Sequence, residues 1–331
     1  MKSVALGFSG GVDSAVSAVL LKRAGYDVHG VYLDNTDENA KNEALAGAEA
    51  VGIPLEVRDV HEQLEEKVCK KFELAYLNGE TPNPCILCNP SLKFKNLMDT
   101  GCDFIATGHY AKSENGALYK GHPDNDQSYM LCRLTRPQLN RLLLPLGAFS
   151  KTEVRSLASE FGLKVATKPD SMEICFIPDK NYIGWLESRR PELRSTLCGD
   201  FVFHGEVIGQ HDGIYRWTVG QRLPGLIDGR KVYISKIDAA GARIELALWE
   251  ELFKTKVCAR DFNWLCDMPD TFEASVRVRH TKWENPPCTV YKDGNGVRIE
   301  CHEPVRAPAA GQSAVVYRDD RVIGAGFITG E

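Results

Sequence analysis

The sequence predicts an α/β protein in which an N-terminal doubly wound parallel sheet is followed by a small central β-rich domain and a C-terminal β-barrel. Three observations favour this architecture. Short apolar runs alternate with helical periodicity up to about residue 190, a glycine loop directly follows the first apolar run, and short alternating runs fill the last third of the chain. With 331 residues, the chain is long enough for two or three domains.

The N-terminal part alternates strands with helices. Apolar runs at 4–8, 28–33, 55–60 and 104–107 indicate buried strands, and helical periodicity appears near 13–24, 38–51, 61–77, 91–99, 126–134 and 151–161. Glycines at 25, 52, 79, 101 and 162 each follow a helical pattern, where a residue that accepts left-handed dihedrals ends a helix easily. We therefore expect a first domain over residues 1–195.

The remaining residues are expected to be all-β. Short alternating runs at 201–207, 232–237, 274–279, 297–301 and 313–317 are separated by glycine, proline and aspartate. Junctions are expected near 191–199 and 250–256. This divides the rest of the chain into a central β-rich domain over 196–253 and a barrel over 254–331.

The charge of the chain excludes a global basic field that would attract nucleic acid, because the formal net charge is −5. An RNA partner would have to be held by local patches, although a solvated charged face is the alternative for each of them. The candidates are Arg189, Arg190 and Arg194; Lys93 and Lys95; and Arg277, Arg279, His280 and Lys282 beside Trp283.

The composition also indicates where the protein works. No run of about 18 apolar residues is present to span a bilayer, and the first apolar stretch, at 4–8, is too short for a signal peptide. Eleven cysteines without an export signal argue against a secreted disulfide framework. We therefore expect a cytoplasmic protein with no membrane partner.

The first apolar run leads into the loop Ser9-Gly10-Gly11-Val12-Asp13-Ser14 and then directly into a helix. Two adjacent glycines let the backbone approach a ligand, while successive N–H groups and the helix N-terminus attract an anion. The loop lacks the lysine of a Walker loop and the third glycine of a dinucleotide fingerprint. It resembles the pyrophosphate loop of ATP pyrophosphatases, and an ordinary glycine turn would not require the flanking serines and aspartate.

Three cysteines stand out among the eleven. Cys85 and Cys88 lie in the segment 81–89, which two prolines predict to be a rigid loop between helical patterns. A Cys-x-x-Cys pair in a reducing compartment is more often redox-active or metal-bound than structural. Cys175 follows among polar and basic neighbours, of which Lys168 is a candidate for lowering the thiol pKa.

These motifs together resemble the tRNA-specific 2-thiouridylases, a family of PP-loop ATP pyrophosphatases, over nearly the whole chain. Besides the glycine loop and the segment 81–89, the resemblance rests on Lys93-Phe94, Ala106-Thr107-Gly108-His109-Tyr110, Asp126-Gln127-Ser128-Tyr129, Leu144-Pro145-Leu146-Gly147, Asp170-Ser171, Ile174-Cys175-Phe176-Ile177, Thr218-Val219-Gly220-Gln221-Arg222, Gly311-Gln312-Ser313-Ala314-Val315-Val316-Tyr317 and Gly324-Ala325-Gly326.

The resemblance implies an enzyme that transfers sulfur to the wobble uridine of tRNA, using ATP and Mg²⁺. It implies that Cys88 is the nucleophile and that Cys175 carries sulfur as a persulfide, received from a sulfur-relay protein or a cysteine desulfurase. The implied ATP-binding residues are Gly7, Phe8, Ser9, Gly10, Gly11, Val12, Asp13, Ser14, Leu33 and Gly108. The implied RNA-binding residues are Asn83, Pro84 and Cys85, facing the target base, and Asn125, Asp126, Gln127 and Arg277, contacting tRNA.

The sequence departs from the family pattern at three positions. Many members have aspartate where Cys85 stands, lysine where Asn125 stands and tyrosine where Val278 stands. With three thiols present, Cys85, Cys88 and Cys175 are also candidate ligands of a [4Fe–4S] cluster that would carry sulfide, with zinc as the alternative occupant. The persulfide and cluster mechanisms both remain open at this point.

Two other functions also fit part of the sequence. A PP-loop enzyme that adenylates a different tRNA base or a small substrate would share the glycine loop but would not need the three cysteines. A non-enzymatic, zinc-bearing RNA-binding module would explain Cys85, Cys88 and the basic patches but would leave the phosphate loop unused.

Overall fold

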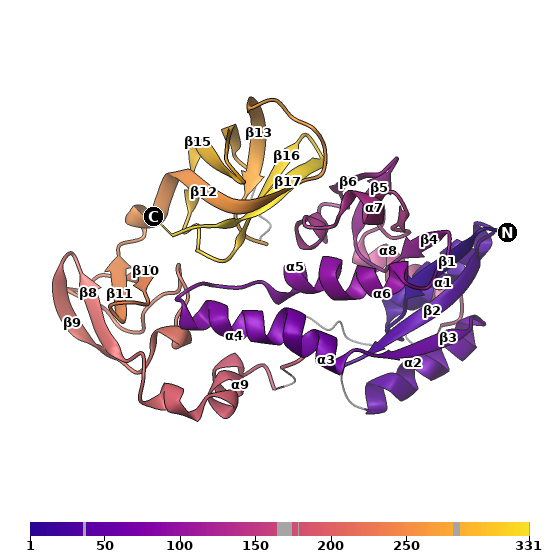
Figure 1. Cartoon of the computed structure of the whole chain (residues 1–331), viewed down its shortest axis with the longest axis horizontal. Helices are drawn as coiled ribbons and strands as arrows, with labels where there is room; N and C mark the ends of the chain where they lie inside the picture. Colours follow the sequence, from indigo (N-terminus) through magenta and orange to yellow (C-terminus); the bar gives the residue numbers. More distant parts are fainter. Residues whose placement is uncertain (36–37, 164–173, 178, 281–284, 331) are drawn as a thin grey trace. The chain divides into compact units, whose positions relative to one another are not determined.

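The computed structural model of the chain describes residues 1–35, 38–163, 174–177, 179–280 and 285–330 (Figure 1). The chain divides into two compact units. The first unit comprises residues 1–68, 85–176 and 320–322, and the second comprises residues 69–84, 177–319 and 323–331. Among the described residues, no helix combines the length and the apolar character that crossing a membrane requires.

The first unit is built on a five-stranded sheet with the order β3-β2-β1-β4-β7, in which every pair of neighbours is parallel. This confirms the predicted doubly wound sheet. The order places β1 between β2 and β4, so the chain turns to opposite sides of the sheet after these strands. The strands are β1 (Ser3–Gly7), β2 (Asp27–Asp34), β3 (Leu55–Asp59), β4 (Phe104–Ala106) and β7 (Leu142–Leu143).

Helix α1 packs closely on this sheet because its contact face carries small side chains. Ala15 and Ala18 lie in one buried cluster with Val4 and Leu6 of β1, and Ala48 of α2 joins the same cluster. Short side chains let the helix backbone approach the strands and hold its N-terminus at the end of β1. The helical elements of the first unit are α1 (Val12–Arg23), α2 (Glu38–Val51), α3 (His61–Leu64), η1 (Glu65–Cys69), α5 (Pro84–Cys88), η2 (Asn89–Lys93), α6 (Phe94–Met98), η3 (Ser128–Leu131), α7 (Arg136–Leu139) and α8 (Lys151–Glu160).

Two sequence predictions for this unit are wrong in part. The segment 81–89 is not a loop throughout, because α5 begins at Pro84 and runs to Cys88. Proline is favoured in the first turn of a helix, where its missing N–H would have no partner. The helix expected near 126–134 is reduced to the short 3₁₀ turn η3.

A hairpin of β5 (Ala111–Glu114) and β6 (Ala117–Lys120) was not predicted. Its turn is Asn115-Gly116, with φ of +49° and +73°. Asparagine-glycine at these angles is the preferred two-residue connection between antiparallel strands. The Asn115-Gly116 dipeptide is therefore a hairpin signal, which the search for longer periodic elements missed.

The second unit contains a four-stranded sheet with the order β10-β11-β8-β9. Its strands are β8 (Gly199–Phe203), β9 (Glu206–His211), β10 (Tyr233–Asp238) and β11 (Arg243–Ala247). The single strand expected at 201–207 is instead a hairpin, because His204 and Gly205 turn the chain at φ of +48° and +88°. Short 3₁₀ turns flank this sheet at η5 (Pro191–Arg194), η6 (Ile214–Arg216) and η7 (Glu250–Leu252).

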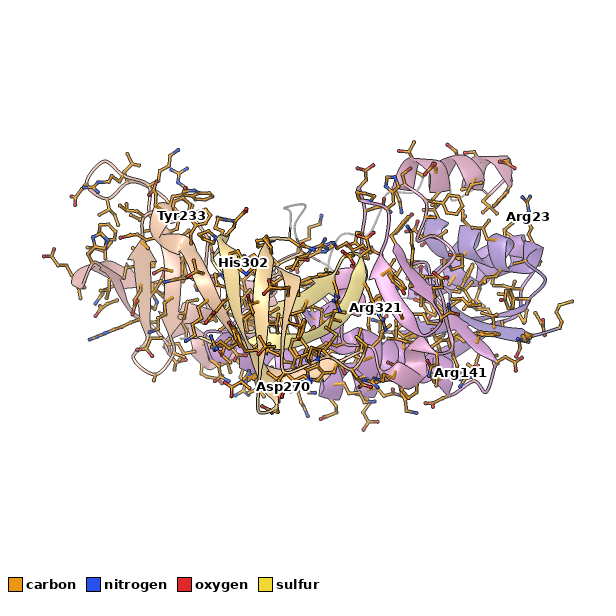
Figure 2. All side chains as sticks on the ribbon, turned by 90° about the horizontal axis from the view of Figure 1, so that it is seen from above. Arg23, Arg141, Tyr233, Asp270, His302 and Arg321 are labelled. Carbon is orange, nitrogen blue, oxygen red and sulfur yellow. The ribbon has the colours of Figure 1, made fainter. Side chains whose placement is uncertain are left out.

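The predicted C-terminal barrel is confirmed. Its strands follow the order β12-β15-β14-β13-β16-β17, and the pairing of β12 with β17 closes the barrel. Buried valine, isoleucine and cysteine side chains from all these strands fill the interior. Figure 2 shows the barrel strands with their side chains, among which His302 and Arg321 are labelled. The strands are β12 (Phe253–Trp264), β13 (Thr271–Arg277), β14 (Pro287–Asp293), β15 (Gly296–Arg306), β16 (Ser313–Arg318) and β17 (Arg321–Ile328).

Two helices complete the second unit, α4 (Lys70–Leu77) and α9 (Tyr182–Arg189). They lie side by side through two aromatic contacts (Figure 1). The rings of Phe72 and Trp185 meet edge to face at 5.8 Å, and those of Tyr76 and Tyr182 stack at 4.8 Å. Helix α9 was not predicted, because Gly184 interrupts a short pattern and the helix depends on tertiary contacts such as these.

Candidate functional site

The glycine loop joins β1 to α1 and leaves the helix N-terminus open. Gly11 occupies the N-cap position, and no side chain caps the helix. The Ser14 hydroxyl donates to the Gly11 carbonyl at 3.0 Å. The Ser9 hydroxyl lies 3.4 Å from the Ser14 hydroxyl. The positive end of the helix dipole and two hydroxyls therefore converge on the loop, an arrangement that suits a phosphate group.

Packing against α2 fixes the shape of this loop. Gly10 has a φ of +74°, and a Cβ atom added there would stand 2.8 Å from the Cα atom of Ala44. Gly47, one turn along α2, also approaches Gly10 closely. The loop can therefore pass over the helix only where side chains are absent.

The carboxyl ends of β1 and β4 meet at the point where the strand order reverses, which is where open α/β sheets bind ligands. Gly108 follows β4, and a Cβ atom added to it would stand 2.9 Å from the Cβ atom of Asp13. Leu33 lies at the carboxyl end of the neighbouring strand β2. The structure thus brings the glycine loop and Gly108 together at one edge of the sheet, with Leu33 on the next strand.

Two residues that the sequence analysis did not single out hold the Asp13 carboxylate. The Lys151 ammonium lies 2.8 Å from both carboxylate oxygens, and the Tyr110 hydroxyl donates to Oδ1 at 2.5 Å. Lys151 begins α8, whose N-terminus is fixed by a capping box of Ser150 and Glu153. The helical periodicity near 151–161 placed Lys151 at the start of a helix, and the capping pattern supports the same start.

A loop segment predicted to contact RNA supports Tyr110. The Gln127 side chain accepts the N–H of Tyr110 at 3.0 Å, and its backbone N–H donates to the Tyr110 carbonyl at 2.7 Å. Asp126 accepts from the backbone of Gly121 and Ser128. Asn125 has a buried Oδ1 atom with no hydrogen-bond partner among the described residues. The acceptor groups of Asp126 and Gln127 therefore already stabilise the fold.

Cys85 and Cys88 lie three residues apart on α5, so their side chains share one face of the helix. Cys85 is exposed and Cys88 is half-buried. Cys175 is exposed, and its sulfur lies 3.5 Å from the Asn35 side-chain nitrogen. The charge of Cys175 acts on both Cys85 and Cys88, so the structure brings the three thiols into one neighbourhood.

Burial dominates the ionisation of these thiols. It raises the pKa of Cys88 to about 11, although the Lys93 charge and a hydrogen bond from the Lys93 backbone act in the opposite direction. The pKa of Cys85 is also raised by desolvation, because protein atoms surround the sulfur even though solvent reaches the side chain. Cys88 is therefore a protonated thiol at neutral pH in the absence of substrates.

His109 connects the thiols to the nucleotide side of the site. It follows Gly108, lies 2.7 Å from the Thr107 hydroxyl and stacks on Phe94 at 6.1 Å. Burial and the nearby Lys93 charge hold its pKa well below the ordinary value. His109 is therefore neutral at physiological pH, and Lys93 supplies the positive charge of this region.

The described residues contain no group of three histidine, cysteine, aspartate or glutamate side chains that could hold a metal ion. The three cysteines as placed therefore do not fit a [4Fe–4S] cluster or a zinc ion. Lys168, the cation predicted to act on Cys175, lies outside the described residues.

The remaining candidates belong to the second unit. Arg277 ends β13, where its Nε atom donates to Asn285 at 2.9 Å and its guanidinium lies over the Tyr317 ring at 5.3 Å. Arg279 donates hydrogen bonds to the carbonyl oxygens of Ala307 and Val219, so its guanidinium stabilises the fold. Asn83 and Pro84 precede Cys85 in the chain. Lys282 and Trp283 lie outside the described residues.

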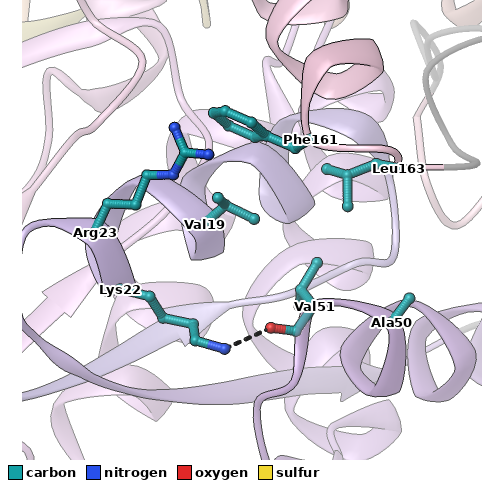
Figure 3. A pocket seen from close by; sticks show the side chains of 7 residues that line it. All are labelled: Val19, Lys22, Arg23, Ala50, Val51, Phe161 and Leu163. Carbon is teal, nitrogen blue, oxygen red and sulfur yellow. Dashed lines mark hydrogen bonds between the residues drawn. The ribbon is translucent and has the colours of Figure 1, made fainter.

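A hollow of about 380 Å³ in the first unit does not belong to this site. The Lys22 ammonium donates a hydrogen bond to the carbonyl oxygen of Val51 at 2.7 Å (Figure 3). The Arg23 guanidinium lies 4.1 Å from the centre of the Phe161 ring. Lys22 and Arg23 lie at the C-terminal end of α1, about 16 Å along the helix from the glycine loop. The hollow is thus separate from the N-terminal end of α1, where the glycine loop suits a phosphate group.

Three family profiles match the chain. They are the tRNA methyl transferase HUP domain over residues 2–179, the tRNA methyl transferase PRC-barrel domain over residues 196–247 and the aminomethyltransferase beta-barrel domain over residues 254–328.

Relatives named tRNA-specific 2-thiouridylase MnmA match the whole chain. The protein from Geobacter metallireducens is 38% identical, covering 99% of this chain and 96% of its own. The protein from Carboxydothermus hydrogenoformans is 38% identical, and the match covers 99% of this chain and 97% of the relative. The protein from Brucella suis is 40% identical, and the match covers 98% of this chain and 89% of the relative.

Proposed function

The chain belongs to the family of tRNA-specific 2-thiouridylases, and from this premise we propose that it is a tRNA-uridine 2-sulfurtransferase acting on the wobble uridine. One observation carries the proposal. Cys175 acts electrostatically on Cys88, in the same compact unit as a glycine loop suited to phosphate. An enzyme that replaces an activated oxygen with sulfur needs both features.

Activation of the uridine comes first, because its O2 atom is a poor leaving group. We propose that O2 takes AMP from ATP and that pyrophosphate leaves. The residues from Gly7 to Ser14, with Leu33 and Gly108, would bind the nucleotide, supported by the uncapped N-terminus of α1 and its position at the reversal of strand order. Mg²⁺ would balance the phosphate charge and needs few protein ligands besides phosphate oxygens and water.

Sulfur transfer then proceeds through a persulfide on Cys175. A sulfur-relay protein or a cysteine desulfurase loads Cys175 as a persulfide. Cys88 loses its proton and attacks the Cys175 Sγ atom, which forms a disulfide between them, breaks the persulfide bond and releases hydrosulfide. Hydrosulfide adds to C2 of the adenylated uridine, AMP leaves, and a thiol reductant restores both cysteines. Because the pKa of Cys88 is raised, Lys93 has the role of stabilising its thiolate.

The finer assignments belong to the same proposal. Asn83, Pro84 and Cys85 would face the target base, and Asn125, Asp126, Gln127 and Arg277 would contact tRNA. Residues 1–195 would carry the chemistry, with 196–253 and 254–331 as the RNA-contacting domain and the barrel. A cytoplasmic location remains a prediction.

A thiolation assay tests the function directly. The full-length protein is incubated with unmodified tRNA, ATP, Mg²⁺ and a sulfur donor, and 2-thiouridine is measured by mass spectrometry of the digested tRNA. We expect Cys175→Ser and Cys88→Ser to lose thiolation by about a hundredfold or more while still releasing pyrophosphate in a tRNA-dependent manner. The matched control is Cys198→Ser, because Cys198 is also exposed.

The results separate the competing functions. Cys175→Ser with full thiolation would refute the sulfur-transfer scheme. A wild-type protein that binds tRNA but never consumes ATP would indicate an RNA-binding module instead. ATP consumption that tRNA does not stimulate would indicate an enzyme that adenylates a small substrate.

A further inference from the structure

The second unit contains a hollow of about 420 Å³ between α4 and the C-terminal end of α9. Its lining consists of Lys70, Glu73 and Leu74 from one face of α4, and of Arg189 and Arg190 from the end of α9. Three cations and one anion leave this hollow positively charged, whereas the chain as a whole carries a net charge of −5. The hollow is therefore a local exception to the charge of the molecule.

Glu73 organises the two arginines. Its side chain is only 6% exposed, and one carboxylate oxygen accepts from Nε of Arg189 at 2.9 Å while the other accepts from Nε of Arg190 at 2.5 Å. Burial opposes ionisation of this carboxyl, but the hydrogen bonds from both arginines outweigh it and lower its pKa. Glu73 is thus an ionised anchor that fixes two guanidinium groups side by side.

Aromatic packing holds Arg189 from a second direction. Its guanidinium lies 4.6 Å from the ring centre of Trp185, which itself packs on Phe72 of α4. The two arginine side chains are 29% and 43% exposed, so solvent still reaches them. Groups that are fixed before a ligand arrives lose little conformational entropy on binding.

An apolar side chain lies beside these cations. Leu74 is 52% exposed although it lines the hollow. A nucleotide combines an anionic phosphate with the apolar faces of a ribose and a base, so this pairing of fixed guanidinium groups with an exposed leucine matches the chemistry of an RNA backbone.

We propose that this hollow binds one phosphodiester of the tRNA backbone, with Arg189 and Arg190 on the phosphate oxygens, Lys70 at the rim and Leu74 against the adjoining sugar. The inference rests on the proposed function, since it takes tRNA as the substrate. It gives the chain an RNA-binding site outside the barrel and outside the unit that holds the cysteines.

The neighbouring Arg194 provides a matched contrast. The sequence grouped it with Arg189 and Arg190, but its Nε atom donates to Glu187 at 3.1 Å and it does not line the hollow. Its side chain is 73% exposed. Removing its charge changes the net charge of the protein as much as removing that of Arg190 does.

The test measures tRNA affinity of the full-length protein by filter binding between about 50 and 300 mM salt. We expect Arg190→Gln and Arg189→Gln each to weaken binding about five- to tenfold and to reduce the slope of log affinity against log salt by about 0.7–0.9. Arg194→Gln should change affinity less than about twofold. Lys70→Gln, a rim substitution with small structural consequences, should weaken binding about threefold.

Glu73→Gln distinguishes an organised site from a general field. The substitution makes the protein more positive, so a diffuse field would bind tRNA more tightly. Loss of the anchor should instead weaken binding at least threefold, because the guanidinium groups are no longer fixed. Circular dichroism of each variant verifies that it folds, and the arginine and lysine variants decide the question if Glu73→Gln does not.

The outcomes are distinct. If Arg189→Gln, Arg190→Gln and Lys70→Gln bind tRNA like Arg194→Gln, while the wild type binds and thiolates normally, the hollow only joins α4 to α9 and the inference fails alone. If the wild type does not bind tRNA at all, the proposed function fails and the inference fails with it.

Discussion

At the residue scale, the site depends on thiols whose ionisation the surroundings suppress. Burial raises the pKa of Cys88 to about 11, and only Lys93 and the local backbone act in the other direction. A thiolate is a far better nucleophile than a thiol, so the free protein holds Cys88 in its less reactive form. Under the proposed mechanism, substrate binding would have to lower the pKa of Cys88 before it attacks Cys175.

Alkylation kinetics test the state of Cys88. Because the pKa is raised, the thiolate fraction at pH 7 is roughly a hundredfold below that of an ordinary thiol, and iodoacetamide should modify Cys88 correspondingly more slowly than glutathione. The rate should rise about tenfold per pH unit between about pH 7 and pH 9. Peptide mass spectrometry in a Cys85→Ser background measures the modified fraction.

The control for this prediction is Lys93→Gln. Since the Lys93 charge lowers the pKa of Cys88, its removal should slow alkylation further. A Cys88 that reacts as fast as glutathione at pH 7, or that reacts faster in the Lys93 variant, would contradict the assignment.

The sequence singled out three cysteines that the structure brings together, but it did not indicate which charged groups act on them. Cys85, Cys88 and Cys175 do lie in one neighbourhood. Lys168 was expected to act on Cys175 and lies outside the described residues, whereas Lys93 acts on Cys85 and Cys88, an effect that the sequence did not indicate. Which lysine faces a thiol depends on the path of the helices after Cys88, where a π-helical turn rotates the chain, and periodicity does not reveal that rotation.

At the element scale, the glycine loop depends on the approach of α2 as much as on its own dihedral angles. The sequence showed that Gly10 gives access to an anion. It did not show that Ala44 and Gly47 crowd the loop from behind, because that contact joins residues distant in the chain. Glycine is thus required at position 10 because the backbone there is left-handed and because a side chain would collide with α2.

Two alanine substitutions separate these reasons. Gly25→Ala, at φ +86° with open space around the Cβ position, should cost roughly 1 kcal/mol of unfolding free energy from backbone strain alone. Gly10→Ala, at φ +74° and 2.8 Å from Ala44, should cost about 2–4 kcal/mol, because overpacking adds to the strain.

Urea unfolding measures both substitutions, and calorimetry measures ATP affinity. Gly10→Ala should weaken ATP binding more than about tenfold, whereas Gly25→Ala should leave it unchanged. Equal effects of the two substitutions on stability and binding would show that α2 does not confine the loop.

The apolar strands of the parallel sheet and the strongly periodic helices were predictable, whereas the helices that depend on local proline placement or tertiary contacts were not. Helix α2 was placed at its observed bounds, and β1 to β4 within one residue or two. The pattern failed at α5, where Pro84 starts a helix, and at α9, which depends on Trp185 packing against Phe72. Short elements gain most of their stability from tertiary contacts that a single sequence does not reveal.

At the scale of the whole molecule, a protein with a net charge of −5 must bind RNA through sites in which local cations dominate. The Debye length is about 8 Å at physiological ionic strength, so charges beyond that distance hardly act on a bound phosphate. Affinity for tRNA should therefore follow particular side chains rather than net charge. The second unit illustrates this, since one hollow gathers three cations.

A substitution of remote acidic residues tests this statement. Glu206 and Glu303 are exposed residues of β9 and β15 that do not line the hollow. The double variant Glu206→Gln/Glu303→Gln changes the net charge from −5 to −3, yet the dissociation constant for tRNA at about 150 mM salt should change less than about twofold. An affinity gain that equals the loss in Arg190→Gln would indicate that a global field governs binding.

The closed barrel has a consequence for behaviour at high concentration. Each of its strands has a neighbour on both sides, because β12 pairs with β15 and also with β17. A strand whose backbone groups are already satisfied on both edges offers little template for addition of a strand from another molecule. Cross-molecular β-pairing, and the fibrous aggregates that it starts, should therefore not begin at the barrel while it remains folded.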